Sequence, residues 1–85
     1  MKLIYCKKCQ DIVRLDTDPR KCGCGKSSGC YIDDLRAEIK GPCIPIGIDN
    51  RSFCVAVTRR PQSGLGSRFE AFVIPMECPT VEVKP

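Results

Sequence analysis

Two closely spaced pairs of cysteines near the N-terminus constrain this chain more than any other feature. Cys6 and Cys9 have the spacing C-x2-C, and after twelve intervening residues Cys22 and Cys24 have the spacing C-x-C. Two such pairs, each in a short turn, can direct four sulfurs at one ion, at about 2.3 Å each for zinc. This pattern is typical of a structural tetrathiolate zinc site. We therefore predict that these four cysteines bind one zinc ion per chain.

The length and composition of the chain agree with a metal-stabilised domain. Its 85 residues make one domain at most, and chains this short rarely bury enough apolar surface without a disulfide, a metal or a partner subunit. No apolar run is long enough for a secretory signal or a membrane span, so we expect a cytoplasmic protein with reduced cysteines. The sequence has no histidine, which leaves thiolates as ligands for a transition metal. An iron–sulfur cluster also uses four cysteines and stays an alternative to zinc.

The other four cysteines stand alone in the sequence: Cys30, Cys43, Cys54 and Cys78. Isolated cysteines in apolar surroundings behave as small buried hydrophobes, and this is the prediction for all of them except the first. Cys30 follows the second pair closely enough to replace one of its members as a ligand, so the spacing leaves this alternative open. A redox role for the first pair is not favoured, because no helix follows Cys9.

The hydrophobic pattern predicts a zinc ribbon over residues 1–33. Residues 11–16 alternate as in a strand, an Asp-Pro turn follows, and the chain then returns to the second cysteine pair. A further strand is expected over residues 29–33, so the ribbon is either a β-hairpin or a three-stranded sheet. Residues 34–40 fit either a helix that a Gly-Pro step ends or a strand, and the sequence does not decide between them.

The remainder of the chain, residues 34–85, is expected to pack on the ribbon as a strand/helix/strand extension. Residues 43–48 are apolar, but Pro45 predicts an edge strand or an extended segment. Residues 51–60 combine the alternation of a strand with the cap residues and the following proline of a short helix, which leaves both open. Two more strands are predicted, a buried one over residues 69–75 and a last one over residues 80–85.

Three segments of the chain resemble small, uncharacterised zinc-ribbon proteins of bacteria and their phages. The segments are CKKC…KCGCGKSSGCYIDD, PIGIDNRSF and GLGSRFEAFVIPMECPT, so the resemblance covers nearly the whole chain. It implies an N-terminal metal ribbon, a compact second half and one short helix at about residues 51–60, and it carries the four-cysteine motif onto the two pairs described above. It implies no activity, and the other four cysteines lie outside its motif. The expected fold is a single small α+β domain over residues 1–85, stabilised by zinc.

Positive charge is concentrated on the predicted ribbon. Residues 1–30 contain seven Lys or Arg and three Asp, which gives a net charge of +4. This asymmetry suits a phosphate backbone or an acidic protein, although part of it would offset the negative charge of a tetrathiolate zinc centre. The basic residues that would make such a contact are Lys7, Lys8, Arg14, Arg20, Lys21 and Lys26.

The chemistry-bearing residues do not indicate an enzyme. Histidine, the commonest general base, is missing, and no glycine-rich loop has the context of a phosphate-binding site. Four thiolates around zinc would also leave no open coordination position for a catalytic water. We therefore predict a protein without catalytic activity.

Two binding functions remain. The first is a small adaptor or inhibitor that docks on a protein partner, in a phage–host or prophage setting, or that self-associates. It is favoured because the near-neutral second half has more apolar residues than a layer of this size hides. These residues are Ile44, Ile46, Ile48, Phe53, Phe69, Phe72 and Val73. The alternative is a nucleic-acid-binding module that uses the basic surface of the ribbon. No membrane and no small-molecule substrate are expected as partners.

Overall fold

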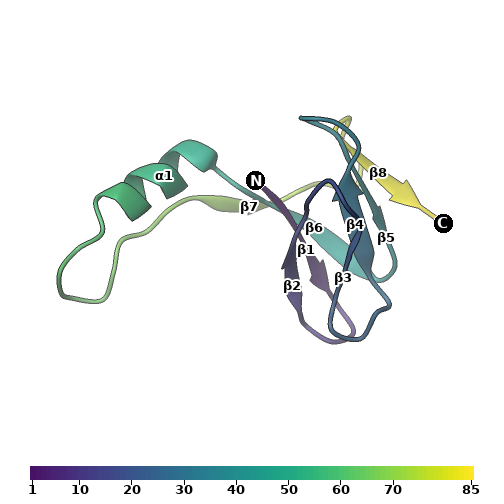
Figure 1. Ribbon diagram of the computed structural model, residues 1–85, viewed down its shortest axis with the longest axis horizontal. Coiled ribbons are helices and arrows are strands. Elements are labelled where there is room, and N and C mark those ends of the chain that lie inside the picture. Colours follow the sequence, from purple (N-terminus) through teal and green to yellow (C-terminus); the bar gives the residue numbers. More distant parts are fainter.

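Eight short strands and one helix make up the protein in a computed structural model that describes all 85 residues (Figure 1). In chain order they are β1 (Lys2–Cys6), β2 (Ile12–Arg14), β3 (Arg20–Lys21), β4 (Ser28–Tyr31), β5 (Ala37–Lys40), β6 (Cys43–Ile48), α1 (Asn50–Thr58), β7 (Ala71–Val73) and β8 (Val81–Lys84). The strands form two four-stranded sheets, with the orders β2-β1-β6-β7 and β3-β4-β5-β8. The predicted small α+β class is confirmed.

Strands from both halves of the chain share each sheet. β1 pairs antiparallel with β2 and with β6, and β6 continues the sheet to β7. In the second sheet β3, β4 and β5 are antiparallel neighbours, whereas β8 joins β5 in parallel. Residues 1–33, the predicted ribbon, contain two hairpins, β1–β2 and β3–β4, which lie in different sheets. Two layers can bury apolar side chains against each other, which one short ribbon cannot do.

A small apolar core joins the two sheets. Its buried members are Ile4, Cys6, Val13, Leu15, Cys22, Ala37 and Ile39. The predicted alternation over residues 11–16 is confirmed, because Val13 and Leu15 are buried whereas Ile12 is 56% exposed. Cys6 and Cys22, one from each cysteine pair, belong to this core, so the candidate metal site is continuous with it.

Two local questions are settled by turns and by pairing with distant segments. The undecided segment after β4 becomes β5, because the Asp33 carboxylate accepts hydrogen bonds from the N–H groups of Leu35 (2.9 Å) and Arg36 (2.7 Å) and so closes a turn there.

β6 is an interior strand, which corrects the prediction that Pro45 restricts it to an edge. The Pro45 carbonyl accepts from the Ile74 N–H at 3.0 Å, just beyond β7. In an antiparallel strand the nitrogen and the carbonyl of one residue face the same neighbouring strand, so the nitrogen of Pro45 faces the β7 side. Its missing N–H therefore removes no hydrogen bond between β6 and β1.

β7 is more exposed than the sequence predicts. The predicted buried strand over residues 69–75 is reduced to Ala71–Val73, and Phe72 and Val73 are 56% and 68% exposed. Within that segment only Ile74, just after the strand, is buried. The physical reason is that β7 lies at the free edge of the first sheet, where no second layer covers it.

α1 and the loop after it project from the two sheets as an arm (residues 50–69; Figure 1). The predicted helix is confirmed, but none of its residues is buried. Phe53 on the helix and Phe69 on the returning segment pack edge to face, with 4.9 Å between ring centroids. At the base of the arm the Glu70 N–H donates to the Ser52 hydroxyl at 2.8 Å. None of the protein's helical segments has the length and hydrophobicity of a membrane span.

Candidate metal centre

The first cysteine pair lies in the turn between β1 and β2. The N–H of Gln10 donates a hydrogen bond to the carbonyl of Cys6 at 2.8 Å. Gln10 has a left-handed φ of 62°, which turns the chain after Cys9 toward β2. In the same turn the Lys7 N–H donates to the carbonyl of Pro42 at 2.8 Å, so the turn is held against the segment that leads into β6.

The second pair lies in the turn between β3 and β4. The Gly25 N–H donates to the Cys22 carbonyl, and the Cys22 N–H donates to the Ser27 carbonyl, both at 3.0 Å. Gly25 has a φ of 75°, a conformation that glycine adopts without a side-chain penalty. Asp11 links the two turns, because its carboxylate accepts a hydrogen bond from the Gly23 N–H at 2.8 Å.

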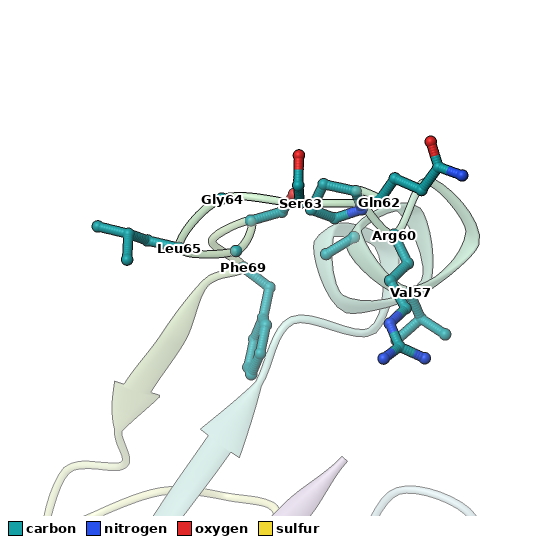
Figure 2. Close-up of a pocket in the computed structure, with 11 residues that line it drawn as sticks. Val57, Arg60, Gln62, Ser63, Gly64, Leu65 and Phe69 are labelled. Carbon is teal, nitrogen blue, oxygen red and sulfur yellow. The ribbon is translucent and has the colours of Figure 1, made fainter.

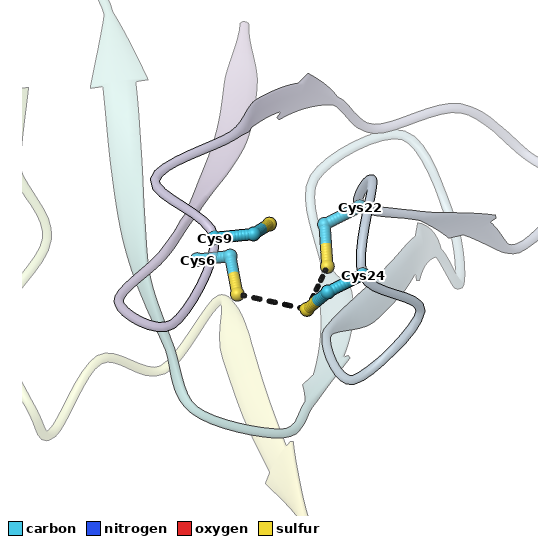
Figure 3. A group of neighbouring side chains, drawn as sticks. All are labelled: Cys6, Cys9, Cys22 and Cys24. Atoms are coloured by element: carbon cyan, nitrogen blue, oxygen red, sulfur yellow. Dashed lines mark hydrogen bonds between the residues drawn. The ribbon is translucent and has the colours of Figure 1, made fainter.

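The four predicted ligand sulfurs converge between these turns (Figure 3). The sulfurs of Cys6, Cys9, Cys22 and Cys24 all lie within 4.8 Å of one another. Cys24 Sγ is 3.8 Å from Cys6 Sγ and 3.5 Å from Cys22 Sγ. Ligands with bonds of about 2.3 Å in a tetrahedral site would be about 3.8 Å apart. All eight cysteines are free thiols, so the spacing and the chemistry of this cluster fit one four-coordinate metal ion.

The thiols of this cluster differ in their pKa values. The Ser27 hydroxyl, together with N–H groups of the first turn, lowers the pKa of Cys6. Burial acts to raise the pKa of Cys22, but the Ser27 N–H, 3.4 Å from its sulfur, and the neighbouring thiols lower it to about 6. The Lys26 N–H acts to lower the pKa of Cys24, but burial and the other three thiols raise it to about 11. Thiols this close can all ionise only when a cation offsets their mutual repulsion.

Ser27 is a site residue that the sequence analysis missed. It is 0% exposed, and its hydroxyl oxygen has no hydrogen-bond partner in the structure. The same hydroxyl acts to lower the pKa of both the Cys6 and the Cys43 thiols, so it lies near both sulfurs and can donate to a metal-bound Cys6 thiolate. The sequence offers no signal that separates Ser27 from Ser28, since only the fold buries one of the two against the cysteines.

The predicted basic contact residues are all exposed and surround the two hairpins: Lys7, Lys8, Arg14, Arg20, Lys21 and Lys26. The two arginines are engaged within the protein. Arg14 pairs with Asp16 at 3.8 Å, and the Arg20 guanidinium donates to the Arg14 carbonyl at 3.2 Å. The four lysines lie in or next to the cysteine turns, where their charge can offset that of the thiolates.

The other four cysteines lie apart from the cluster. Cys30 is buried in β4, and its thiol donates to Glu38 Oε1 at 3.6 Å, so it does not replace a ligand. Cys43 and Cys78 are half-buried. Cys54 is exposed on α1, which corrects the prediction that it packs as a buried hydrophobe. The correction follows from the position of the arm, which leaves the helix without a layer to pack on.

No family model matches the chain, and comparisons with curated proteins and with solved structures return no match either.

Proposed function

We propose that the four clustered cysteines bind one zinc ion and that this ion stabilises the fold. The observation that supports this most directly is the separation of the sulfurs, all within 4.8 Å, which suits a single ion. A cluster of several irons would hold its ligands farther apart. One cysteine pair lies in a hairpin of each sheet, so a shared metal would tie the two layers together where the apolar core is small.

In this proposal the zinc has a structural role and the protein is not an enzyme. Four thiolates complete a tetrahedral site, so no coordination position is open for a substrate or an activated water. The structural role is consistent with the burial of Cys6 and Cys22 in the core. The function that follows is binding, with the metal-stabilised sheets as a rigid scaffold.

A groove between the free edges of the two sheets is the surface that suits a protein partner best. It has a volume of about 480 Å³ and a mostly apolar lining, and it contains Ile44, Val73, Met76 and Val83 (the apolar groove). Val73, Met76 and Val83 are 68%, 99% and 66% exposed, and Lys7 stands at the rim. β7 and β8, which flank the groove, are both terminal strands of their sheets. An extended apolar segment of a partner can add to such an edge while its side chains fill the groove.

We therefore propose a zinc-stabilised adaptor or inhibitor that docks on a partner protein through the apolar groove. Elemental analysis tests the metal, with an expected content of about one zinc and no iron per chain. Docking is tested by capture from a nuclease-treated host lysate with the zinc-loaded chain and with Met76→Glu/Val83→Glu. Loss of a captured protein in this variant, but not in a Leu65→Glu control on the arm, supports the groove. Equal capture by all three proteins contradicts it.

A further inference from the structure

The arm contributes no residue to the metal centre or to the apolar groove, so neither of these sites gives it a role. α1 has nine residues and none is buried, although a helix this short is marginal in water without packing. Val55 and Val57 are 47% and 59% exposed, and Leu65 at the loop tip is fully exposed. Figure 2 shows Leu65 pointing away from the helix, while Val57 and Arg60 point to one common side.

The arm carries the whole net charge of the protein. Residues 50–69 contain Arg51, Arg59, Arg60 and Arg68 and no acidic residue. The rest of the chain holds ten basic and ten acidic residues, so its formal charge is zero and becomes −2 with a tetrathiolate zinc site. The arm and the metal-binding hairpins (residues 1–30) each have a formal charge of +4, but the thiolates of a zinc site would reduce that of the hairpins to +2, whereas the arm keeps all of its charge.

None of these four guanidinium groups is engaged within the protein. The ion pairs of the structure join Arg14 to Asp16, Arg36 to Asp33, and Lys84 to Glu38 and Glu82. No hydrogen bond within the protein is donated by an arginine side chain of the arm, so each one can bind an external anion.

The arginines are spread along the arm and do not form one cluster. Arg51 and Val55 are exposed on α1, four residues apart, and Arg59, the exposed C-cap residue, follows after four more residues. Eight residues of helix place the two arginines about 12 Å apart along the axis. Arg60 lines a hollow of about 470 Å³ between the helix and the loop, together with Val57 and Phe69 (Figure 2). Arg68 lies on the returning segment.

We propose that the arm binds the phosphate backbone of a nucleic acid through Arg51, Arg59, Arg60 and Arg68. A row of separated cations matches a chain of phosphates, which recur about every 3.4 Å along one strand. The use of arginine at all four positions agrees with this, because the planar guanidinium donates two parallel hydrogen bonds to a phosphate. This binding goes beyond docking at the apolar groove and uses a different surface.

The test uses the full zinc-loaded chain and fluorescently labelled oligonucleotides of about 20 nucleotides: single-stranded RNA, single-stranded DNA and duplex DNA. We expect binding to at least one of them by fluorescence anisotropy. Four phosphate contacts predict that the affinity falls about 50-fold for a single strand, and about 150-fold for a duplex, between about 50 mM and about 200 mM salt. The three probes also show whether a single strand or a duplex is the source of the phosphates.

Two matched variants separate the arm from the hairpins. Changing all four arm arginines to glutamine should lower the affinity at least about 10-fold and flatten the salt dependence. The control changes Lys7, Lys8, Lys21 and Lys26 to glutamine, which removes the same charge from the other end, and should lower the affinity less than about 3-fold. Equal losses, or a larger loss in the lysine variant, would overturn the assignment to the arm.

Two further outcomes also overturn the proposal. One is the absence of binding to every probe at low salt. The other is displacement of the probe by polyglutamate as effectively, charge for charge, as by unlabelled oligonucleotide, which would indicate an acidic protein surface as the partner. The arginine variant must keep its zinc and its capture of a protein through the groove, so a failure of this proposal is distinguishable from a failure of the proposed adaptor function.

Discussion

The backbone N–H of Ser27 donates to the sulfur of Cys22 at 3.4 Å, while the hydroxyl of the same residue lies beside the sulfur of Cys6. One buried residue therefore contacts a cysteine of each pair. Groups that donate to ligand sulfurs hold them in place and favour their thiolate form. Together with the hydrogen bond from the Gly23 N–H to the Asp11 carboxylate, Ser27 connects the two hairpins at the metal centre.

Ser27→Ala is expected to keep one zinc per chain but to weaken its binding about 10-fold, because the donor to the Cys6 thiolate is lost. Competition with a chromogenic chelator measures the affinity. Ser28→Ala, at the neighbouring half-buried position, serves as the control and should bind zinc as the wild type does. Unchanged affinity in Ser27→Ala would mean that the hydroxyl is an unpaired buried group without a role at the metal.

Cys9→Ser is expected to lose both the zinc and the cooperative unfolding transition. Metal binding supplies folding free energy in a domain of this size, and Cys9 is exposed, so its replacement removes a ligand without disturbing the core. Zinc content by elemental analysis and thermal unfolding by circular dichroism measure the two effects. Cys30→Ser is the matched control, because Cys30 is buried but lies outside the cluster, and it should keep its zinc.

Gly41→Ala is expected to destabilise the protein by about 3 kcal/mol or more and to weaken zinc binding. Gly41 has a φ of 97°, and an added Cβ would overlap the Lys26 carbonyl oxygen, in the second cysteine turn. Gly64→Ala tests the backbone penalty alone, because Gly64 has a similar φ of 99° with nothing within 4 Å. It should cost only about 1–2 kcal/mol, and similar losses in both variants would contradict the close contact.

Among the four cysteines outside the cluster, alkylation of the zinc-loaded protein should modify Cys54 first and Cys30 last. Cys54 is exposed on α1, whereas burial and the neighbouring Glu38 carboxylate raise the pKa of Cys30 and keep it a neutral thiol at pH 7. Because the thiolate is the reactive form, modification of Cys30 should require a pH above the usual range for cysteine. Mass spectrometry of peptides after increasing times measures the order. Early modification of Cys30 would mean that β4 opens readily.

Cys54→Ala should change the free energy of unfolding by no more than about 0.5 kcal/mol, because the side chain is exposed. Cys43→Ala should cost more, about 1–2 kcal/mol, since Cys43 is half-buried and packs against the core. Chemical denaturation of both variants, with zinc content checked, measures the difference. Equal effects would indicate that the arm is packed in solution.

Much of the candidate metal site could be predicted from the sequence. The spacing within each cysteine pair encodes its turn locally, through a few residues and their backbone conformations, so the convergence of the four sulfurs is predictable. The residues of the helix segment left helix and strand open, with Asn50 or Ser52 as the expected cap, and only the resemblance favoured the helix. In the structure the cap is Asp49, whose carboxylate accepts from the Ser52 N–H at 3.1 Å. The alternation that buries Val13 and Leu15 is likewise local.

The tertiary structure alone decided which strands pair and which surfaces stay open. β6 became an interior strand because β1 and β7 flank it, although its proline suggested an edge. Ser27 is buried because the two cysteine hairpins pack together around it. Cys54 is exposed because α1 projects from the sheets. Residues 50–69, which hold the net charge of the protein already in the sequence, became an arm that projects from the sheets (Figure 1). The reason is that strand pairing and burial depend on contacts between residues far apart in the chain, and a local sequence pattern contains no information about such contacts.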